Sequence, residues 1–330
     1  MTQGKFNRCV LIITLMLLIV STMSTGCTSR HGDKFPLFGQ ETLLHTLERD
    51  QGRVNEIVFN YDGTIIASGA ENGTVSLWQV AEGILLHEIV HPGAVNSVSF
   101  SPDGSIIASG ASDGKVRLWR VTDGELISTL EHKVEVSSVA FAPNGNTLAS
   151  GSFVGTIRLW QVSDGKLLQE YGGECIDPVM DIAFAPDGAT LVSASLDVVK
   201  LWRVSDGALL HTLGEYTEQI TSMDFSPTGD IVATGSFDEM IKLWQVSDGT
   251  LREWQDLSGS MLTIAFSPDG AILASGDGMV QLWQVTDGEL LRIQSGHKNP
   301  QVQSIAFSPD GAILATGTID GILWLWEAPQ

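Results

Sequence analysis

Apolar and polar residues alternate in short runs along most of the chain, and the runs recur in a fixed order. One cycle begins with apolar positions at Val95, Val98 and Phe100, and after a turn it continues with the β-prone run 106–109. Alternation with a period of two residues is typical of half-buried β-strands. No stretch of the repeated region follows a helical period over a comparable length. The pattern therefore predicts an all-β protein built from short strands.

A turn led by an aromatic residue recurs once in each cycle, as in Phe100-Ser-Pro-Asp-Gly104. Proline presets φ for the turn, and glycine takes the left-handed conformation that other residues avoid. A second hairpin signal, Thr122-Asp-Gly124, precedes the last run of the cycle at 125–130. Each cycle thus predicts four strands joined by hairpins. The aromatic residues that lead the turns are Phe59, Phe100, Phe141, Phe184, Phe225, Phe266 and Phe307.

Seven tryptophans, each preceded by leucine, keep step with these turns. Neighbouring members lie 39 to 43 residues apart, which is a period typical of repeat architectures. One four-stranded sheet cannot bury both of its faces, whereas seven copies stacked radially can, as in a β-propeller. The tryptophans are Trp78, Trp119, Trp160, Trp202, Trp244, Trp283 and Trp326.

The repeats resemble those of the WD40 family over about residues 41–326. The resemblance implies a seven-bladed β-propeller whose turns between second and third strands lie on an upper surface where partners commonly bind. One family feature is missing throughout, because the Asp that usually follows the repeat Trp is replaced by Gln, Arg or Glu, as at Gln79 and Arg120.

The resemblance also implies a buried hydrogen-bond network of Asp, His, Ser or Thr, and Trp within a blade. Only two repeats have all four residue types, because repeat 3 has His132 but carries Val154 at the Asp position. We expect the network in repeats 2 and 7. Its members would be His91, Ser109, Asp113 and Trp119 in repeat 2, and His297, Thr316, Asp320 and Trp326 in repeat 7.

The two ends of the repeat region predict how the ring closes. The last repeat stops shortly after Trp326 and has no fourth strand, whereas residues 41–47 resemble the fourth strand at 208–213. We expect residues 41–47 to complete the last blade, which would cover sheet edges that are otherwise prone to aggregate. The predicted propeller is then residues 41–330.

The segment 1–26 has the order of an export signal. Two basic residues precede an apolar run over 9–20, which is shorter than the roughly 20 residues that a membrane span needs. Ser24-Thr-Gly-Cys27 resembles a bacterial lipobox, which implies lipid on Cys27 and a place in the cell envelope on the non-cytoplasmic side. A cleaved ordinary signal and an uncleaved anchor are the alternatives. Residues 27–40 would form a short tether.

The net charge limits the classes of partner, and the cysteine content limits the possible disulfides. The net charge of −21 at pH 7 disfavours nucleic acid and anionic lipid surfaces. If Cys27 carries lipid, Cys175 has no partner in the mature chain, so no disulfide framework forms. Stability must then come from the core and from ring closure of a monomeric propeller.

The sequence carries no recognised catalytic or cofactor-binding motif. It has no Gly-rich phosphate loop, Gly-x-Ser-x-Gly, His-Glu-x-x-His or Cys-x-x-Cys. The many Asp-Gly pairs lie at hairpin turns and lack the alternating carboxylates of a calcium loop. His91, His132 and His297 lie in different repeats, which favours buried hydrogen bonding over a metal site. We predict no enzymatic activity, no cofactor and no metal.

One position in the turn between second and third strands holds unusual residues. Tight exposed turns normally take Gly, Asn, Asp or Ser, yet several repeats place Phe, Leu or Ile just before the Asp position. On one face these side chains would form an apolar patch of the kind that marks an interaction site; the alternative is that they pack inward over the centre of the ring. The position holds Glu71, Ser112, Phe153, Leu196, Phe237 and Ile319.

A second position, two residues before the Trp, is basic at Arg117, Arg158, Lys200 and Lys242. Pairing with an Asp of the same blade is favoured there over an acidic-ligand site.

These features predict a non-enzymatic, envelope-anchored scaffold that binds a protein or peptide. One alternative is an envelope assembly or structural lipoprotein, resembling the propeller lipoproteins that support outer-membrane barrel insertion, although the blade count and WD40 signature argue against close kinship. A propeller hydrolase or lyase is the less favoured alternative.

Overall fold

The computed structural model describes residues 37–38, 42–49, 52–172, 177–214, 216, 218–255, 263–276, 279–294 and 301–328, with the backbone alone at 37–38, 253–255 and 292–294. The predicted signal, Cys27, Cys175 and His297 lie outside these residues. Every regular element of the described chain is a β-strand. Within these same ranges, no helix has the length and apolar character needed to cross a membrane.

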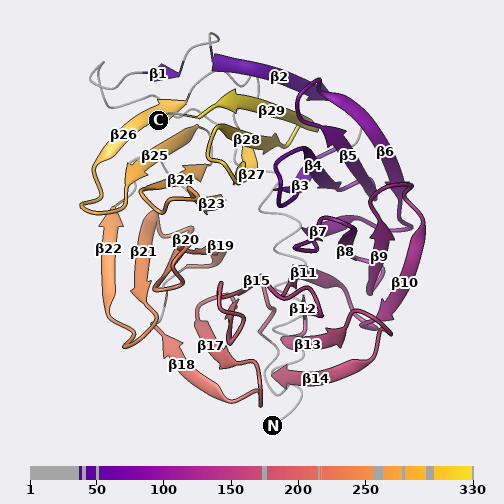
Figure 1. Cartoon of the computed structure of the whole chain (residues 1–330). Helices are drawn as coiled ribbons and strands as arrows, with labels where there is room; N and C mark the ends of the chain where they lie inside the picture. The colour runs from indigo at the N-terminus through magenta and orange to yellow at the C-terminus, as the bar shows by residue number, and fades with distance from the viewer. Residues whose placement is uncertain are drawn as a thin grey trace. The chain divides into compact units, whose positions relative to one another are not determined.

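The strands form seven sheets arranged around a common centre, which confirms the predicted seven-bladed propeller (Figure 1). Blade 1 comprises β3 (Val54–Phe59), β4 (Ile65–Ala70), β5 (Thr74–Gln79) and β6 (Ile84–Val90), and blade 2 comprises β7 (Val95–Phe100), β8 (Ile106–Ala111), β9 (Lys115–Arg120) and β10 (Leu126–Glu131). Blade 3 comprises β11 (Val136–Phe141), β12 (Thr147–Ser152), β13 (Thr156–Gln161) and β14 (Leu167–Gly172), and blade 4 comprises β15 (Asp181–Phe184), β16 (Thr190–Ala194), β17 (Val199–Arg203) and β18 (Leu209–Leu213). Blade 5 comprises β19 (Ile220–Phe225), β20 (Ile231–Ser236), β21 (Met240–Gln245) and β22 (Leu251–Gln255), and blade 6 comprises β23 (Thr263–Phe266), β24 (Ile272–Gly276), β25 (Val280–Gln284) and β26 (Leu290–Gln294). Blade 7 contains β27 (Val302–Phe307), β28 (Ile313–Thr318) and β29 (Ile322–Glu327).

The N-terminal strand β2 (Leu43–Glu48) closes the ring, as predicted for residues 41–47. It pairs antiparallel with β29, with Leu43 opposite Trp326 and Leu47 opposite Leu323, so the two ends of the propeller share blade 7 (Figure 1). A further strand, β1 (Leu37–Phe38), pairs in parallel with β26 and makes blade 6 five-stranded. Strand β1 was not predicted, and it falls within residues 27–40, the segment expected to be a tether.

The Pro-Asp-Gly turns pack against one another around one end of the blades. In blade 2 the Asp103 carboxylate accepts hydrogen bonds from the Ser101 hydroxyl (2.6 Å) and the Ser105 N–H (3.0 Å). The glycine of each turn lies against the turn of the preceding blade, and in six blades it meets the proline of that turn, as with Gly145 and Pro102; Gly104 meets Asn60 instead. We call this end the lower face, and the end with the turns between second and third strands the upper face.

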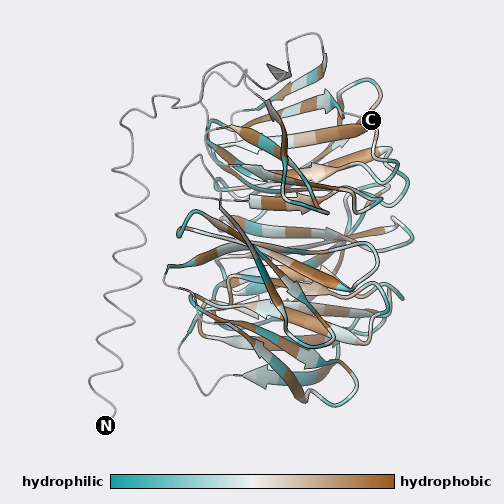
Figure 2. Cartoon of the chain, turned by 90° about the vertical axis from the view of Figure 1, so that its left-hand side faces the viewer, coloured by the Kyte–Doolittle hydropathy of each residue, from teal (hydrophilic) through white to brown (hydrophobic). Residues whose placement is uncertain are grey.

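The core lies between neighbouring blades. One cluster joins Leu118 of blade 2 to Val136 and Trp160 of blade 3, and each of the seven clusters spans two blades in this way. Figure 2 shows apolar residues along the strands and polar ones at the turns of both faces. A glycine in the second strand permits the close approach, because a Cβ at Gly110 would lie 2.6 Å from Val136 Cγ1. Six of the seven repeat tryptophans are buried, and Trp202 is half-buried.

Candidate functional site

The upper face is built from the turns between second and third strands together with the connections between blades. The backbone ties the two together, because the N–H of His91 donates to the Gly73 carbonyl (2.7 Å) and the N–H of His132 donates to Gly114 (2.9 Å). Each turn is therefore held by the connection that leads to the next blade. This arrangement fixes the position of any side chain that a turn carries.

The six turn residues singled out in the sequence lie around this face. The backbone N–H groups of Phe153, Phe237 and Ile319 donate to the carbonyls of Glu135, Gln219 and Gln301, at 3.2, 3.0 and 3.1 Å. Glu71 and Ser112 make the equivalent bonds to Arg53 and Ala94 (both 2.9 Å), and the Leu196 carbonyl accepts from Ile220 N–H (2.9 Å). The side chains of Phe153, Leu196, Phe237, Ile319 and Ser112 are half-buried, and Glu71 is exposed.

Two residues of the upper face have a backbone conformation that favours glycine. Lys133 (φ 70°) and Glu239 (φ 64°) are the non-glycine residues with positive φ in the described chain, and both are exposed. Glu239 occupies the turn position that Gly114 and Gly155 fill in blades 2 and 3. This conformation costs a non-glycine residue about 1–2 kcal/mol. Such strain is often found at functional sites.

Blade 2 contains the expected network, but an arginine lies between its Asp and its His. Trp119 Nε1 donates to Ser109 Oγ (2.8 Å), which lies 3.0 Å from His91 Nε2. On the other side of the imidazole, Arg117 Nη1 lies 3.0 Å from His91 Nδ1, and the same guanidinium forms an ion pair with Asp113 (2.6 Å). Asp113 and His91 therefore share the network through the guanidinium of Arg117, which contacts both of them.

The network determines the tautomer and the charge of His91. Because Arg117 can only donate, His91 Nδ1 is the acceptor and Nε2 carries the proton that Ser109 accepts. Burial lowers the pKa of His91 to about 4, and the charge of Arg117 lowers it further than the carboxylate of Asp113 raises it. The imidazole is therefore neutral at pH 7, which suits a structural role within the blade.

Blade 5 has a related network that the sequence analysis missed. Trp244 Nε1 donates to the Tyr216 hydroxyl (2.6 Å), which also bonds Thr234 Oγ1 (2.6 Å). Lys242 lies 4.0 Å from the centre of the Tyr216 ring and pairs with Asp238 (3.0 Å). A signal was present, since Tyr216 stands nine residues before Phe225, just as His91 stands nine before Phe100.

The other blades keep parts of this network. In blade 7, Trp326 Nε1 donates to Thr316 Oγ1 (3.4 Å), whereas Asp320 accepts a hydrogen bond from Thr318; His297 lies outside the described residues. In blade 3, Trp160 Nε1 donates to Ser150 (2.8 Å), while the ring nitrogens of His132 have no hydrogen-bond partner in the described part of the chain. The basic residue of blade 3 also forms an ion pair within its own blade, since Arg158 bonds Glu170 (2.7 Å).

The repeats match the family model of the WD domain, G-beta repeat, seven times, at residues 41–79, 83–120, 124–161, 165–203, 207–245, 249–284 and 288–327. The chain belongs to the WD40 family. WD40 propellers are typically non-enzymatic scaffolds that bind proteins or peptides. A comparison with curated proteins finds no match. Among the residues that the structure describes, no group of three or more His, Cys, Asp or Glu side chains could hold a metal ion.

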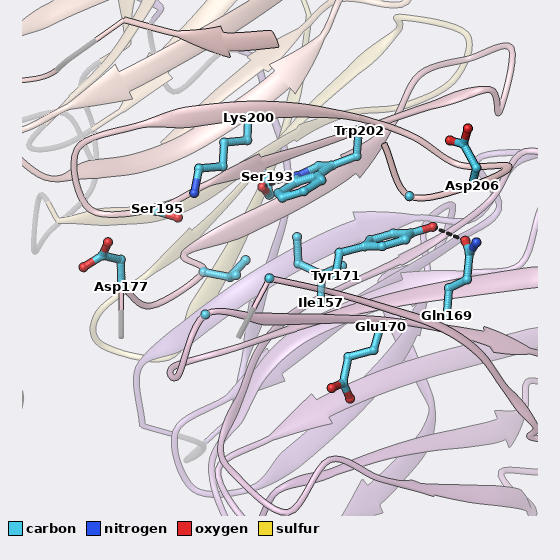
Figure 3. A pocket seen from close by; sticks show the side chains of 14 residues that line it. Ile157, Gln169, Glu170, Tyr171, Asp177, Ser193, Ser195, Lys200, Trp202 and Asp206 are labelled. Atoms are coloured by element: carbon cyan, nitrogen blue, oxygen red, sulfur yellow. Dashed lines mark hydrogen bonds between the residues drawn. The ribbon is translucent and has the colours of Figure 1, made fainter. Parts of the chain in front are cut away.

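This WD40 propeller has a pocket of about 500 Å³ between blades 3 and 4 (Figure 3). Tyr171 and Trp202 form one wall as stacked rings 5.9 Å apart, and the side chains of Lys200, Ser195 and Asp177 lie toward one end. Lys200 forms no ion pair with any described residue. The pocket lies beside Trp202, where His91 and Tyr216 cover the equivalent Trp of blades 2 and 5.

Proposed function

We propose that this WD40 protein is a non-enzymatic scaffold, anchored at the cell envelope through Cys27, that binds a protein or peptide on its upper face. The observation that carries the proposal is the set of apolar side chains at the turns of this face. Phe153, Leu196 and Phe237 come from three consecutive blades, and Ile319 comes from blade 7. Half-buried apolar side chains on a fixed backbone are suited to act as anchors for a partner.

The surroundings of these side chains suggest the chemistry of the partner. Exposed acidic residues lie on the same turns and connections, at Glu71, Glu135, Asp197 and Glu239, and outnumber the basic residues Arg53 and Lys133 beside them. A partner with apolar anchors flanked by basic groups would complement this face. Envelope anchoring rests on the sequence alone, through the order of the signal and the Gly26-Cys27 pair.

A cross-linking pull-down from the organism's own membranes tests this function. The tethered wild type is compared with the variant Phe153→Ser/Phe237→Ser, and Leu168→Ser serves as the control because Leu168 is an exposed apolar residue (45%) on the outer strand β14. Truncating an anchor commonly costs at least about 2 kcal/mol of binding, or roughly a 30-fold loss of affinity. We expect the double variant to lose the partner and the control to keep it.

Melting of the same three proteins completes the test. An unchanged melting temperature with a lost partner supports binding by the upper face. Full retention of the partner would contradict the proposal. So would a strongly lowered melting temperature, because it would show that Phe153 and Phe237 act by packing.

A further inference from the structure

The first strands of the seven blades are linked by a closed ring of hydrogen bonds. In each blade the residue three positions before the turn aromatic accepts, through its side chain, a backbone N–H of the next first strand. Val139 N–H donates to Ser97 Oγ (2.9 Å), and Ile57 N–H closes the circle by donating to Ser304 Oγ (3.1 Å). We call the seven accepting residues the inner belt: Glu56, Ser97, Ser138, Asp181, Ser222, Thr263 and Ser304.

The inner belt solves a problem of the propeller architecture. The first strand of each blade is an edge strand, so half of its N–H groups have no partner within the sheet. A buried N–H without an acceptor costs about 1–3 kcal/mol. A short hydroxyl meets this need in five blades. Blades 1 and 4 use the carboxyl groups of Glu56 and Asp181 instead, which accept from Val98 N–H (2.7 Å) and Met223 N–H (3.1 Å).

A third carboxyl group lies close to the belt. Asp224, two residues further along β19 than the belt residue Ser222, accepts Phe266 N–H (2.8 Å) from blade 6. These three acids are the only charged residues on the first and second strands of the seven blades. The strands packed against β3, β15 and β19 are other first and second strands. No Lys, Arg or His on these elements can therefore balance an ionised Glu56, Asp181 or Asp224.

The environment of the three acids favours their neutral forms. Burial at the centre of the ring, where each side chain keeps some accessible surface, raises the pKa of Glu56 to about 8, of Asp224 to about 7 and of Asp181 to about 6. The charge of Asp181 raises the pKa of Glu56 and of Asp224 further, whereas the hydrogen-bond donors to each carboxylate lower it. Asp181 has the smallest rise and accepts from Ser138 Oγ, Ile182 N–H and Met223 N–H.

We propose that the inner belt and the neighbouring Asp224 form a proton-dependent clasp, in which protonated Glu56, Asp181 and Asp224 hold blades 1 to 2, 4 to 5 and 5 to 6 together and deprotonation weakens these three junctions. A protonated carboxyl still accepts the backbone N–H through its carbonyl oxygen, so the belt stays closed. An ionised carboxyl places a charge at the centre of the ring, where the first and second strands around it carry no cation to balance it. The clasp does not depend on partner binding at the upper face.

The sign of the pH dependence follows from these pKa values. Because the pKa of Glu56 and of Asp224 is higher in the folded chain than in the unfolded chain, their protons stabilise the fold at low pH. This stability is lost as pH rises toward about 8. His91 and His132 act in the opposite direction below pH 6.5, because burial lowers the pKa of both to about 4. The window from pH 6.5 to 8 therefore isolates Glu56 and Asp224, because Asp181, with a pKa of about 6, titrates mainly below it.

Denaturant unfolding of the full chain between pH 6.5 and 8 tests the clasp. For the wild type, the unfolding equilibrium constant should rise by up to about tenfold per pH unit for each acid that stays protonated only in the folded state. Glu56→Gln keeps the shape and the acceptor oxygen but cannot ionise. Its unfolding equilibrium constant should therefore rise less with pH than that of the wild type, and its free energy of unfolding at pH 8 should be higher than that of the wild type. The control Glu71→Gln changes an exposed turn residue and should keep the wild-type profile.

Titration of the wild type by carboxyl ¹³C NMR gives a second, mutation-free result. We expect three carboxyl signals with midpoints between pH 6 and 8 that are assigned to Glu56, Asp181 and Asp224. Midpoints near pH 4 for all three acids would overturn the proposal. Parallel pH profiles for the wild type and Glu56→Gln would overturn it as well.

Discussion

Replacing Trp119 by Ala should remove a large part of the stability of the propeller. The Trp119 side chain is 9% exposed and belongs to the cluster that joins blades 1 and 2, with Leu77 and Val95. Truncating a buried Trp to Ala costs about 3–5 kcal/mol. The variant also removes the donor to Ser109 and the edge contact with His91, whose ring centre lies 5.2 Å away. A lost hydrogen bond adds about 1 kcal/mol.

Three further variants separate the contributions that packing and the indole hydrogen bond make to the free energy of unfolding. Trp119→Phe keeps most of the packing but loses the indole N–H, so it should cost less than Trp119→Ala. Trp202→Ala removes the half-buried Trp beside the pocket of blade 4 and should also cost less. Asp123→Asn alters an exposed turn residue that keeps its acceptor for Glu125 N–H, and its ion pair with Arg120 is exposed. Exposed pairs contribute about 0–1 kcal/mol.

Urea unfolding of these four variants and the wild type, followed by circular dichroism, measures the losses. We expect the largest loss of free energy of unfolding for Trp119→Ala, smaller losses for Trp202→Ala and Trp119→Phe, and the smallest loss for Asp123→Asn. Equal losses for Trp119→Ala and Asp123→Asn would refute the assignment of the repeat Trp to the core between blades.

Three other changes have defined outcomes. Deleting residues 43–48 removes β2 and leaves one edge of β29 unpaired, while its other edge keeps β28, so the protein should aggregate or melt at a lower temperature; a soluble truncation with unchanged melting would contradict this role of β2. Glu239→Gly relieves the positive φ of 64° and should raise the free energy of unfolding by about 0.5–1 kcal/mol, after the entropy cost of glycine; a loss measured in urea would show that the Glu239 side chain stabilises the turn. Metabolic labelling with a palmitate analogue should mark the wild type but not Cys27→Ser, and equal labelling of both would exclude lipid at Cys27.

The sequence predicted the fold well because each blade repeats the same local signals. The Trp period, the Pro-Asp-Gly turns and the likeness of residues 41–47 to a fourth strand led to seven blades and to the correct closing strand. Strand β1 could not be predicted in this way, because Leu37–Phe38 is too short to show alternation. The sequence therefore defined the repeats but not the additions to them.

The candidate site was less predictable, because side-chain reach is not visible in a repeat pattern. The sequence suggested that Asp113 and His91 share a network, but only the structure shows Arg117 between them. Tyr216 was missed because the family pattern directed attention to histidine, although its position nine residues before Phe225 was readable. The inner belt also had a signal, since every repeat carries a polar residue three positions before the turn aromatic.

Site-specific photo-cross-linking in the native membranes tests the binding face most directly. A photoreactive amino acid replaces Phe237 on the upper face or Ala189, an exposed residue in a lower-face turn. The proposed function predicts a discrete cross-linked partner from position 237 and none from position 189. The same partner captured from position 189 alone would contradict binding on the upper face.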